Sequence, residues 1–352
     1  MFPCFSLNGS PHEIGLQHGR LAKRQIDKCI ETYQQLFRSY AKMEWSEAVD
    51  QAAQYINYIE KYDPDIMAEI KGIAEGSGRD LLEIVALNAR SEIMLTTKAL
   101  DGCTSFGILP EAANGTAYMG QNWDWKDSVF DALIVLEITQ ENKPKIKMIT
   151  EAGIVGKFGL NDAGVGVCMN ALACDQNGPG TPLHITMRGI LNSRNMGDAI
   201  ASVINTNIAS AVNFVIGHRD GQILDLEVVP SEFDVLYPED GILVHTNHFV
   251  SPVLKMKVKD LTKHLLPDSL VRYTRAQSLL RNLEGGITFS ALQNMLSDHF
   301  NAPHGICRHQ KVDPLGKELV TVFSFIMDLT NQEIFIAAGK PCETSYQKLQ
   351  AG

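Results

Sequence analysis

The first hundred residues carry apolar side chains at steps of three and four, the spacing of helices that bury one face. Ile26, Ile30 and Tyr33 follow this period. Strand signals are nearly absent here, and we expect residues 1–102 to form a helical N-terminal segment.

Helix boundaries are also visible in this segment. Asp63 followed by Pro64 predicts a helix start, because aspartate caps helix N-termini and proline is tolerated at the first helical position. The run Gly76-Ser77-Gly78 predicts the end of that helix, and Asp80 with Glu83 three residues later predicts the cap of the next one.

From Thr104 onward the pattern changes to short apolar and β-branched runs divided by turn residues, which is typical of multi-stranded antiparallel sheets. The clearest runs are 117–122, 132–138, 146–149, 165–170, 212–217, 223–229, 320–327 and 334–338. Asp220-Gly221 and Thr330-Asn331 predict hairpins. Helical stretches at 183–203 and 270–296 can cover the sheet faces, so we predict an α+β fold of layered helices and sheets.

Composition indicates a globular protein with an ordinary core, since 45% of the 352 residues are hydrophobic and 20% are charged. The net charge of -10 comes from 41 acidic and 31 basic residues, with no long basic run. Nucleic acid is therefore not expected as a partner, because its phosphates require clustered lysine and arginine.

The cysteines do not form a recognisable disulfide framework or zinc motif, because they are odd in number and contain no Cys-x-x-Cys pair. They are Cys4, Cys29, Cys103, Cys168, Cys174, Cys307 and Cys342. A reducing compartment fits best. With no signal-peptide pattern, no 18-residue apolar stretch and no C-terminal Ser-Lys-Leu tripeptide, we expect a cytoplasmic protein without a membrane partner.

The step Gly102-Cys103-Thr104 at the start of a predicted strand is the strongest candidate for chemistry. A thiolate at Cys103 could attack the Gly102 carbonyl, which no side chain obstructs, to give a thioester that water hydrolyses. The new α-amino group of Cys103 would then serve as base beside its own sulfur. The alternative is a buried cysteine that only fills space in the core.

Four further residues could support this nucleophile. Asp124, between two tryptophans, could hold the Cys103 amino group, or be a turn aspartate beside core aromatics. Asn247, after a predicted strand, could donate to an oxyanion, and Arg308 could stabilise the thiolate or be a surface arginine. Asn170 at a strand end is a weaker candidate donor, and alone it suggests a turn residue.

His245 and His248 resemble zinc ligands, but no acidic partner or third ligand stands at matching spacing. We therefore expect no metal and no cofactor.

A set of motifs in this order resembles one known family. The motifs are Gly9-Ser10-Pro11-His12-Glu13-Ile14-Gly15, Glu69-Ile70-Lys71-Gly72, Asp101-Gly102-Cys103-Thr104, Gly120-Gln121-Asn122-Trp123-Asp124, Thr150-Glu151-Ala152-Gly153 and His245-Thr246-Asn247-His248. Together they resemble the acyl-coenzyme A:6-aminopenicillanic acid acyltransferase (isopenicillin N acyltransferase) family of C45 self-processing enzymes.

The resemblance implies a four-layer αββα N-terminal-nucleophile hydrolase fold. It implies cleavage between Gly102 and Cys103 into an α subunit of residues 1–102 and a catalytic β subunit of residues 103–352, which stay associated as one globular domain. By motif, it makes Cys103 the nucleophile, Asp124 the contact of its amino group, Asn247 the oxyanion donor and Arg308 the support of the thiolate. Asn170 transfers more weakly, from relatives that resemble bile-salt hydrolases.

The resemblance implies an acyltransferase or amidohydrolase that works through an acyl-thioester on Cys103. Its partners would be a small amide, an acyl-coenzyme A or an amine, with acyl-coenzyme A as a substrate and not a resident cofactor. The shared core leaves the substrate open. Two alternatives stay open: an inactive homologue that only binds small molecules or a partner, and a papain-like enzyme with a histidine base at His245 or His248.

Overall fold

The computed structural model describes residues 1–95, 102–281, 283–309 and 319–349. Asp101, the first residue of the cleavage motif, lies outside the described residues. So does the C-terminal tripeptide 350–352, on which the expectation about a peroxisomal signal depends.

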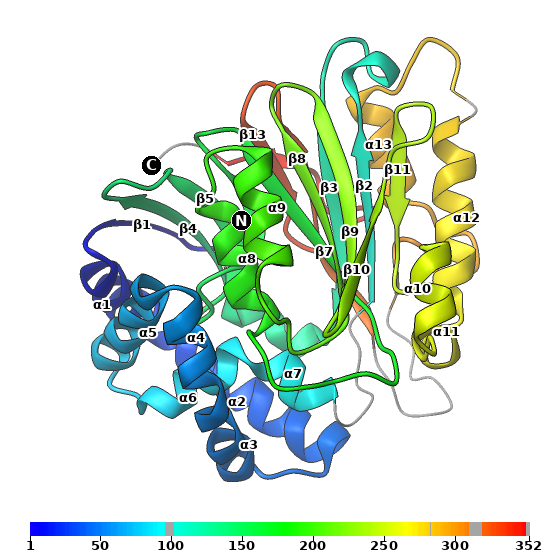
Figure 1. The fold of residues 1–352 in the computed structure, drawn as a ribbon. Coiled ribbons are helices and arrows are strands. Elements are labelled where there is room, and N and C mark those ends of the chain that lie inside the picture. Colours follow the sequence, from blue (N-terminus) through cyan, green and yellow to red (C-terminus); the bar gives the residue numbers. More distant parts are fainter. Residues whose placement is uncertain (96–101, 282, 310–318, 350–352) are drawn as a thin grey trace.

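Two sheets form the centre of the molecule, a mixed sheet of eight strands and an antiparallel sheet of six (Figure 1). In spatial order, the eight-stranded sheet contains β1 (Cys4–Gly9), β4 (Leu133–Gln140), β5 (Ile146–Glu151), β6 (Phe158–Asn161), β7 (Val165–Ala171), β8 (Val212–His218), β9 (Gln222–Val229) and β10 (Glu232–Leu236). The six-stranded sheet contains β11 (Ile242–His245), β2 (Gly102–Ile108), β3 (Tyr118–Trp125), β12 (Val320–Asp328), β13 (Glu333–Ala337) and β14 (Gln347–Lys348).

The two sheets pack face to face, with β2 and β3 against β7, and each outer face carries helices. On the eight-stranded sheet these are α8 (Leu183–Leu191) and α9 (Met196–Ile204). On the six-stranded sheet they are α12 (Asp268–Arg281) and α13 (Phe289–Leu296), with α10 (Pro252–Lys257) and α11 (Thr262–Leu265) beside them. The layer order helix, sheet, sheet, helix confirms the predicted α+β fold with αββα architecture.

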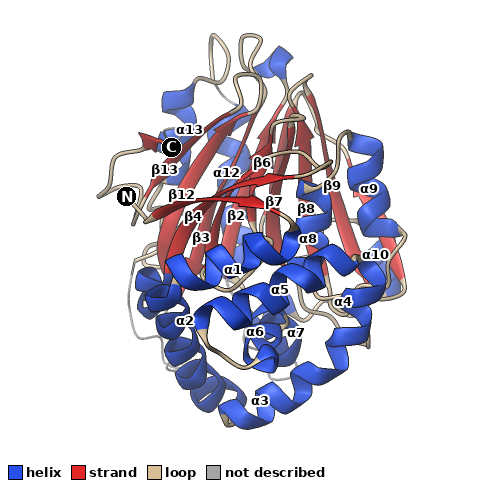
Figure 2. Cartoon of the chain, turned by 90° about the vertical axis from the view of Figure 1, so that its left-hand side faces the viewer, coloured by secondary structure: helices blue, strands red, loops and turns tan. Residues whose placement is uncertain are grey.

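The N-terminal helices gather below the strand ends (Figure 2). They are α1 (Pro11–Leu21), α2 (Lys23–Leu36), α3 (Trp45–Ala52), α4 (Ile56–Tyr62), α5 (Pro64–Ser77), α6 (Leu81–Asn88) and α7 (Arg90–Leu95). The expectation of an all-helical segment needs one correction, because Cys4–Gly9 forms β1 and pairs in parallel with β4. Only Leu7 of this edge strand is fully buried, so its sequence lacks the alternation of apolar and polar residues that predicts a strand.

The predicted helix boundaries are confirmed. The Asp63 side chain accepts the backbone N–H of Asp65 at 2.9 Å, and Gly78 ends the same helix in the left-handed region at φ 68°. Asp80 and Glu83 form a reciprocal capping box at the next helix.

Both predicted hairpins are also confirmed. Strands β8 and β9 pair across Asp220-Gly221, and β12 and β13 pair across Thr330-Asn331. The predicted helical stretch 183–203 forms two helices, because a turn with Asn195 as the cap of the second helix interrupts it.

Aromatic side chains fill the space between the sheets. Trp123 packs at 5.6 Å, centroid to centroid, from Phe323, and Phe158 stacks at 5.5 Å on Phe325. Trp123 is fully buried there. The indole therefore has a core role, which fixes the distance between the sheets around β3.

Buried polar contacts join residues 1–102 to the rest of the chain. Glu69 of α5 accepts two hydrogen bonds from the Arg188 guanidinium of α8, at 2.9 and 2.7 Å, and both side chains are almost completely buried. Asn88 of α6 donates to the Gly153 carbonyl at 2.8 Å and accepts from the Val155 N–H at 3.0 Å. Bidentate and reciprocal contacts of this kind fix one geometry between the layers.

A second buried junction centres on Glu151 at the end of β5. Its carboxylate contacts Arg90 at 2.9 Å and also Lys157 and the Tyr33 hydroxyl. Burial alone would raise the pKa of Glu151, but Arg90 and Lys157 lower it well below its usual range. The carboxylate is therefore ionised and ties two N-terminal helices to the eight-stranded sheet.

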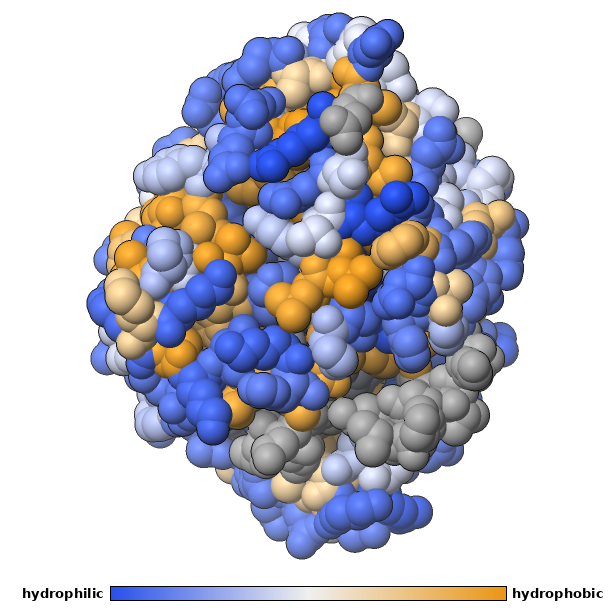
Figure 3. Space-filling model, turned by 90° about the vertical axis from the view of Figure 1, so that its right-hand side faces the viewer, coloured by the Kyte–Doolittle hydropathy of each residue, from blue (hydrophilic) through white to orange (hydrophobic). Residues whose placement is uncertain are grey.

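The outer surface around α12 is largely polar, with separate apolar patches (Figure 3). Met256, Leu270 and Phe300 are among the exposed apolar side chains of the described residues. Scattered apolar groups of this kind are normal on a globular surface. None of the helices in the described ranges is both long and apolar enough to cross a lipid bilayer.

We predict that Glu69→Gln destabilises the protein by about 3–5 kcal/mol, because it leaves the buried Arg188 without a compensating charge. Glu60→Gln is the matched control, since Glu60 pairs with Lys71 at 3.0 Å on the surface and should cost less than about 1 kcal/mol. Urea unfolding of both variants measures this. Equal losses in the two variants would show that the buried pair adds nothing special.

We predict that His18 makes the fold sensitive to acid. Burial, with a further contribution from Arg188, lowers the pKa of His18 to about 3, and its Nε2 accepts the Gly153 N–H at 3.0 Å. Between the unfolded pKa of about 6.5 and this value, the unfolded chain binds one more proton. Stability therefore falls as the pH falls through this range.

In His18→Gln, the loss of unfolding free energy from pH 7 to pH 4.5 should be smaller, with a slope reduced by up to about 1.4 kcal/mol per pH unit. The exposed His264→Gln should keep the wild-type slope. Urea unfolding at several pH values tests this, and identical slopes in His18→Gln and wild type would contradict it.

Candidate active site

Cys103 is the second residue of β2 and is fully buried. It lies directly opposite Trp123 of β3, so both side chains belong to the same face of the six-stranded sheet. Ser105, two residues further on that face, hydrogen-bonds to Asn170 of β7. The Cys103 thiol therefore faces the space between the two sheets.

Gly102 lies opposite Asp124 in the same strand pair. A Cβ atom at Gly102 would stand 3.1 Å from both the Cβ and the Oδ2 of Asp124. The Asp124 carboxylate therefore covers the glycine whose carbonyl would be attacked, on the face opposite the thiol. A side chain at position 102 would crowd it.

Asn247 binds the backbone of the nucleophile. Its Oδ1 accepts the Cys103 N–H at 2.8 Å and a guanidinium N–H of Arg272 at 2.9 Å, while its Nδ2 donates to the Ala171 carbonyl at 3.1 Å. Two donors on one side and a carbonyl on the other fix the orientation of the amide. In this geometry Asn247 acts on Cys103 as an acceptor, whereas the sequence-based role was that of an oxyanion donor.

Arg272 of α12 is the residue of this site that sequence reasoning missed. Its Nη1 donates to the Cys103 carbonyl and, at 3.0 Å, to the Thr104 hydroxyl. With Asn247 on the N–H and Arg272 on the carbonyl, both ends of the Cys103 backbone are held. The only sequence signal was Asp268 four residues earlier, a spacing that predicts an ion pair on any helix.

Asp268 connects Arg272 to Arg308. Its Oδ2 accepts from the Arg272 Nε at 2.8 Å and from the Arg308 Nη2. Burial alone would raise the pKa of Asp268, but the guanidinium groups of Arg272 and Arg308 have the larger, opposite effect. The pKa of Asp268 therefore lies below its usual value. The carboxylate is ionised between two buried cations and holds both in place.

Arg308 in turn reaches Asp124, with Nε 3.4 Å from Oδ2. The Thr321 hydroxyl of β12 donates to the Asp124 Oδ1 at 2.7 Å and accepts from the Arg308 N–H at 2.8 Å, while the Thr321 N–H donates to the Arg308 carbonyl at 3.0 Å. Complete burial nevertheless raises the pKa of Asp124, although Arg308 and Arg272 oppose this. The structure thus joins Cys103, Asn247, Arg308 and Asp124 in one continuous polar cluster.

Asn170 at the end of β7 lies across the sheet interface from this cluster. Its Oδ1 accepts from Ser105 and, at 3.1 Å, from Asn213. Its Nδ2 is buried and has no hydrogen-bond partner among the described residues. Asn170 is therefore not the turn residue of the alternative interpretation, and it presents an amide donor on the face that carries the Cys103 thiol.

The two histidines of the 245–248 motif are engaged elsewhere. His245 bonds the Thr246 carbonyl through Nδ1 and Glu227 through Nε2, both at 2.8 Å. Burial lowers the pKa of His245, but Asp225 and Glu227 raise it more, so it exceeds its usual value. Its Nδ1 meets a carbonyl and its Nε2 a carboxylate, so both nitrogens are directed at groups other than the Cys103 thiol.

His248 bonds Ser269 through Nδ1 at 2.8 Å, and burial lowers its pKa to about 3. The hydrogen bonds seen for both rings thus go to groups other than the Cys103 thiol.

Two surface hollows in the described part of the chain, of about 900 and 470 Å³, lie away from Cys103. The larger is lined by residues that include Arg20 and Asp27, and the smaller by residues that include Tyr58 and Tyr62. Neither forms a pocket beside the nucleophile.

Comparisons with known proteins agree with the sequence resemblance. The sequence profile of the acyl-coenzyme A:6-aminopenicillanic acid acyl-transferase family matches residues 111–342. The acyl-coenzyme A:6-aminopenicillanic-acid-acyltransferase 40 kDa form of Emericella nidulans is 34% identical over 337 residues, which cover 95% of this chain and 91% of that protein. An uncharacterized protein of Archaeoglobus fulgidus is 21% identical over 95% of this chain and 63% of its own length.

Among solved structures, a mutant of the conjugated bile acid hydrolase from Clostridium perfringens matches with a TM-score of 0.47 and 11% identity, over 70% of this chain and 97% of the hydrolase. The penicillin V acylase from Agrobacterium tumefaciens matches with a TM-score of 0.43 and 10% identity, over 67% of this chain and 83% of the acylase. On the profile and the fungal relative, this chain belongs to the acyl-coenzyme A:6-aminopenicillanic acid acyl-transferase family.

Proposed function

We propose that this chain is a self-processing cysteine acyltransferase or amidohydrolase that cleaves itself between Gly102 and Cys103. The observation that carries this proposal is that two side chains hydrogen-bond to the backbone of Cys103, in a member of an acyl-transferase family. Asn247 holds its N–H and Arg272 its carbonyl, inside a buried polar cluster. A buried backbone N–H and carbonyl need partners in any case, but here the partners are side chains of a polar cluster that also contains Arg308 and Asp124.

In the proposed cleavage, the Cys103 sulfur attacks the Gly102 carbonyl carbon, and the C–N bond to Cys103 breaks as the nitrogen takes up a proton. The resulting thioester joins Gly102 to the Cys103 side chain. Water then attacks the thioester carbonyl and releases a carboxyl group on Gly102 and the free thiol. The two products sum to the precursor plus one water.

Asp124 would respond to this change of charge. In the unbroken chain its carboxylate is buried and its pKa is raised. The ammonium group formed at Cys103 would supply a nearby positive charge, which favours the ionised carboxylate. Asp124 covers Gly102, so the new amino group would form next to it. This supports its role as the contact of the Cys103 amino group.

In turnover, Cys103 would form an acyl-thioester with the substrate, and its α-amino group would carry the proton to and from the leaving amine. The unpartnered Nδ2 of Asn170, on the thiol face, supports a role as oxyanion donor. Asp268 would hold the Arg308 guanidinium in place, and this guanidinium would support the thiolate of Cys103. The name of the fungal relative suggests acyl-coenzyme A as acyl donor and a 6-aminopenicillanic acid-like amine as acceptor. Water in place of the amine would give hydrolysis.

We further propose that the two fragments stay associated after cleavage. The Glu69–Arg188 pair and the Arg90–Glu151 contact cross the proposed boundary between segments 1–102 and 103–352 while buried in the core. Separation would expose both pairs together with the apolar core that surrounds them, which would be costly.

Cys103→Ala should give a single chain near 38.8 kDa and no acyl transfer or amide hydrolysis, because the variant lacks the sulfur. Wild type should give two chains, the larger beginning at Cys103, and Cys168→Ala, a buried thiol on β7, should be cut like wild type. Intact mass spectrometry under denaturing conditions measures this. Cleavage in Cys103→Ala, or an uncut but active wild type, would refute the mechanism.

A pair of variants separates the two roles of Asn247. Asn247→Asp keeps an oxygen that accepts from Cys103 and Arg272, whereas Asn247→Ala does not. Self-cleavage should therefore persist in Asn247→Asp and slow by about 10- to 100-fold in Asn247→Ala. Both variants should lose about 10²–10³ in turnover if the amide donates to the oxyanion in that step.

The time course of precursor loss gives the first rate, and single-turnover kinetics of the cleaved protein gives the second. Equal slowing of self-cleavage in both variants would contradict the acceptor role. Unchanged turnover would remove Asn247 from the oxyanion site.

A further inference from the structure

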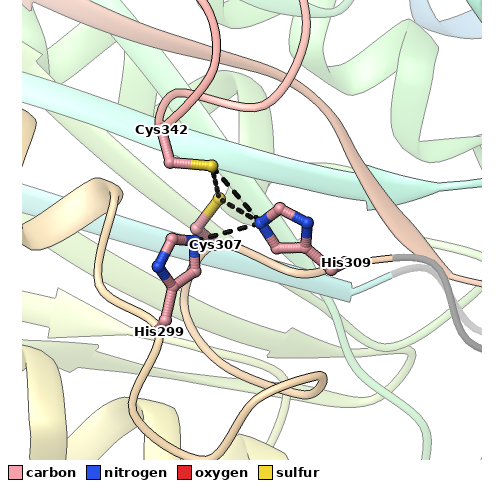
Figure 4. Close-up of side chains that lie close together, drawn as sticks. All are labelled: His299, Cys307, His309 and Cys342. Carbon is pink, nitrogen blue, oxygen red and sulfur yellow. Dashed lines mark hydrogen bonds between the residues drawn. The ribbon is translucent and has the colours of Figure 1, made fainter.

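A second cluster of reactive side chains lies at the edge of the six-stranded sheet, apart from the cysteine nucleophile. It contains His299, from the turn after α13, Cys307 and His309, from the loop before β12, and Cys342, from the turn after β13. Figure 4 shows the four side chains pointing toward one another. One ligand atom from each lies within 4.8 Å of all the others.

Three of the four distances between the ligand atoms match the edges of a tetrahedral zinc site, and the fourth, between the two histidine nitrogens, is shorter. The sulfur atoms of Cys307 and Cys342 are 3.5 Å apart, and the Nε2 of His309 lies 3.3 Å from the Cys342 sulfur and 3.8 Å from the Cys307 sulfur. The Nε2 atoms of His299 and His309 are 3.0 Å apart. Zinc bonds of about 2.3 Å to sulfur and about 2.0–2.1 Å to nitrogen give tetrahedral edges of roughly 3.3–3.8 Å.

The surroundings of His309 also fit a metal ligand. Its Nε2 points into the cluster, while its Nδ1 lies 3.7 Å from Glu343, which Lys340 contacts in turn at 3.1 Å. A carboxylate behind the second ring nitrogen is the usual partner of a metal-bound histidine, because it fixes the tautomer and the orientation of the ring.

We propose that His299, Cys307, His309 and Cys342 bind one zinc ion in a closed, structural Cys₂His₂ site. Thiolate and imidazole ligands in a tetrahedral arrangement select zinc over magnesium or calcium, which prefer oxygen. Binding releases the thiol protons and compensates the thiolate charges, including that of the buried Cys307. This proposal is independent of the function proposed above.

The site would also position Arg308. This arginine stands between the ligands Cys307 and His309, and it contacts Asp268 and Asp124 next to the nucleophile. A metal that ties the loop before β12 to the turn after β13 would fix the backbone on both sides of the guanidinium. We therefore assign the metal a positioning role, with no part in the chemistry itself.

This site departs from the expectation of no metal. Cys307 and His309 are only two residues apart, and Cys342 follows from beyond a hairpin, so no standard zinc spacing announces it. A disulfide between Cys307 and Cys342 is the competing arrangement, but a disulfide requires about 2.05 Å between the sulfurs and leaves two imidazoles beside it without a role.

Elemental analysis tests the proposal on full-length protein, made without a histidine tag and dialysed against micromolar Zn²⁺ and then against metal-free buffer. We expect about one zinc per chain in wild type. Cys307→Ser and Cys342→Ser should retain less than a tenth of that amount. Cys4→Ser, an exposed thiol distant in sequence from the cluster, should retain it all. Circular dichroism confirms that each variant is folded.

Replacement of zinc by Co²⁺ gives a second readout that does not depend on activity. Wild type should show the intense visible bands of tetrahedral cobalt with thiolate charge transfer. His299→Ala, which removes an exposed ligand, should bind Co²⁺ at least tenfold more weakly.

Less than 0.2 zinc per chain in wild type after dialysis would overturn the proposal. A Cys307–Cys342 disulfide in the protein as purified, seen as a loss of two hydrogens by mass spectrometry, would also overturn it. Wild-type amounts of zinc in both Cys307→Ser and Cys342→Ser would place the metal elsewhere, with the same consequence.

Discussion

The pairing of β2 with β3 is the constraint on which the candidate site depends. Its register places Gly102 opposite Asp124 and Cys103 opposite Trp123. Because successive residues of a strand point to opposite faces of the sheet, the groups at the two ends of the Gly102–Cys103 peptide bond face two different layers. The thiol points between the sheets, where Trp123 and its aromatic neighbours fix the spacing. The carboxylate points to the outer layer, where the helix α12 supplies Arg272. A slip of one residue would exchange these faces and separate the groups.

The polar cluster around Cys103 persists because its charges compensate one another. Arg272 and Arg308 are almost fully buried, and an isolated guanidinium there would be very costly. Asp268 lies between them, and Asp124 contacts Arg308, so two carboxylates face two cations in one network. Removing any one of these four charges would leave the buried network with one charge that is not compensated. The same logic applies to Glu69 and Glu151 at the N-terminal helices, where buried pairs join segments distant in the sequence.

Local patterns predicted much of the fold because the relevant forces are local. Helix caps at Asp63 and Asp80, and hairpins at Asp220-Gly221, depend on residues within a few positions of one another. The strand β1 was missed because its partner β4 lies more than a hundred residues away, and as an edge strand it needs little apolar alternation. Pairing over such a distance is decided by the sheet as a whole.

The sequence by itself determined the identity of Cys103 as candidate nucleophile, the motif positions of Asp124, Asn247 and Arg308, and the alternation that builds two sheets. Tertiary structure alone decided that Arg272 binds the Cys103 carbonyl and that the Asn247 amide accepts from the Cys103 N–H. It alone gathered His299, Cys307, His309 and Cys342 into one cluster. The physical reason is that a motif records which residue types stand near one another along the chain. Hydrogen bonds and metal ligands depend on distance and orientation, which arise only when separate strands and helices pack together.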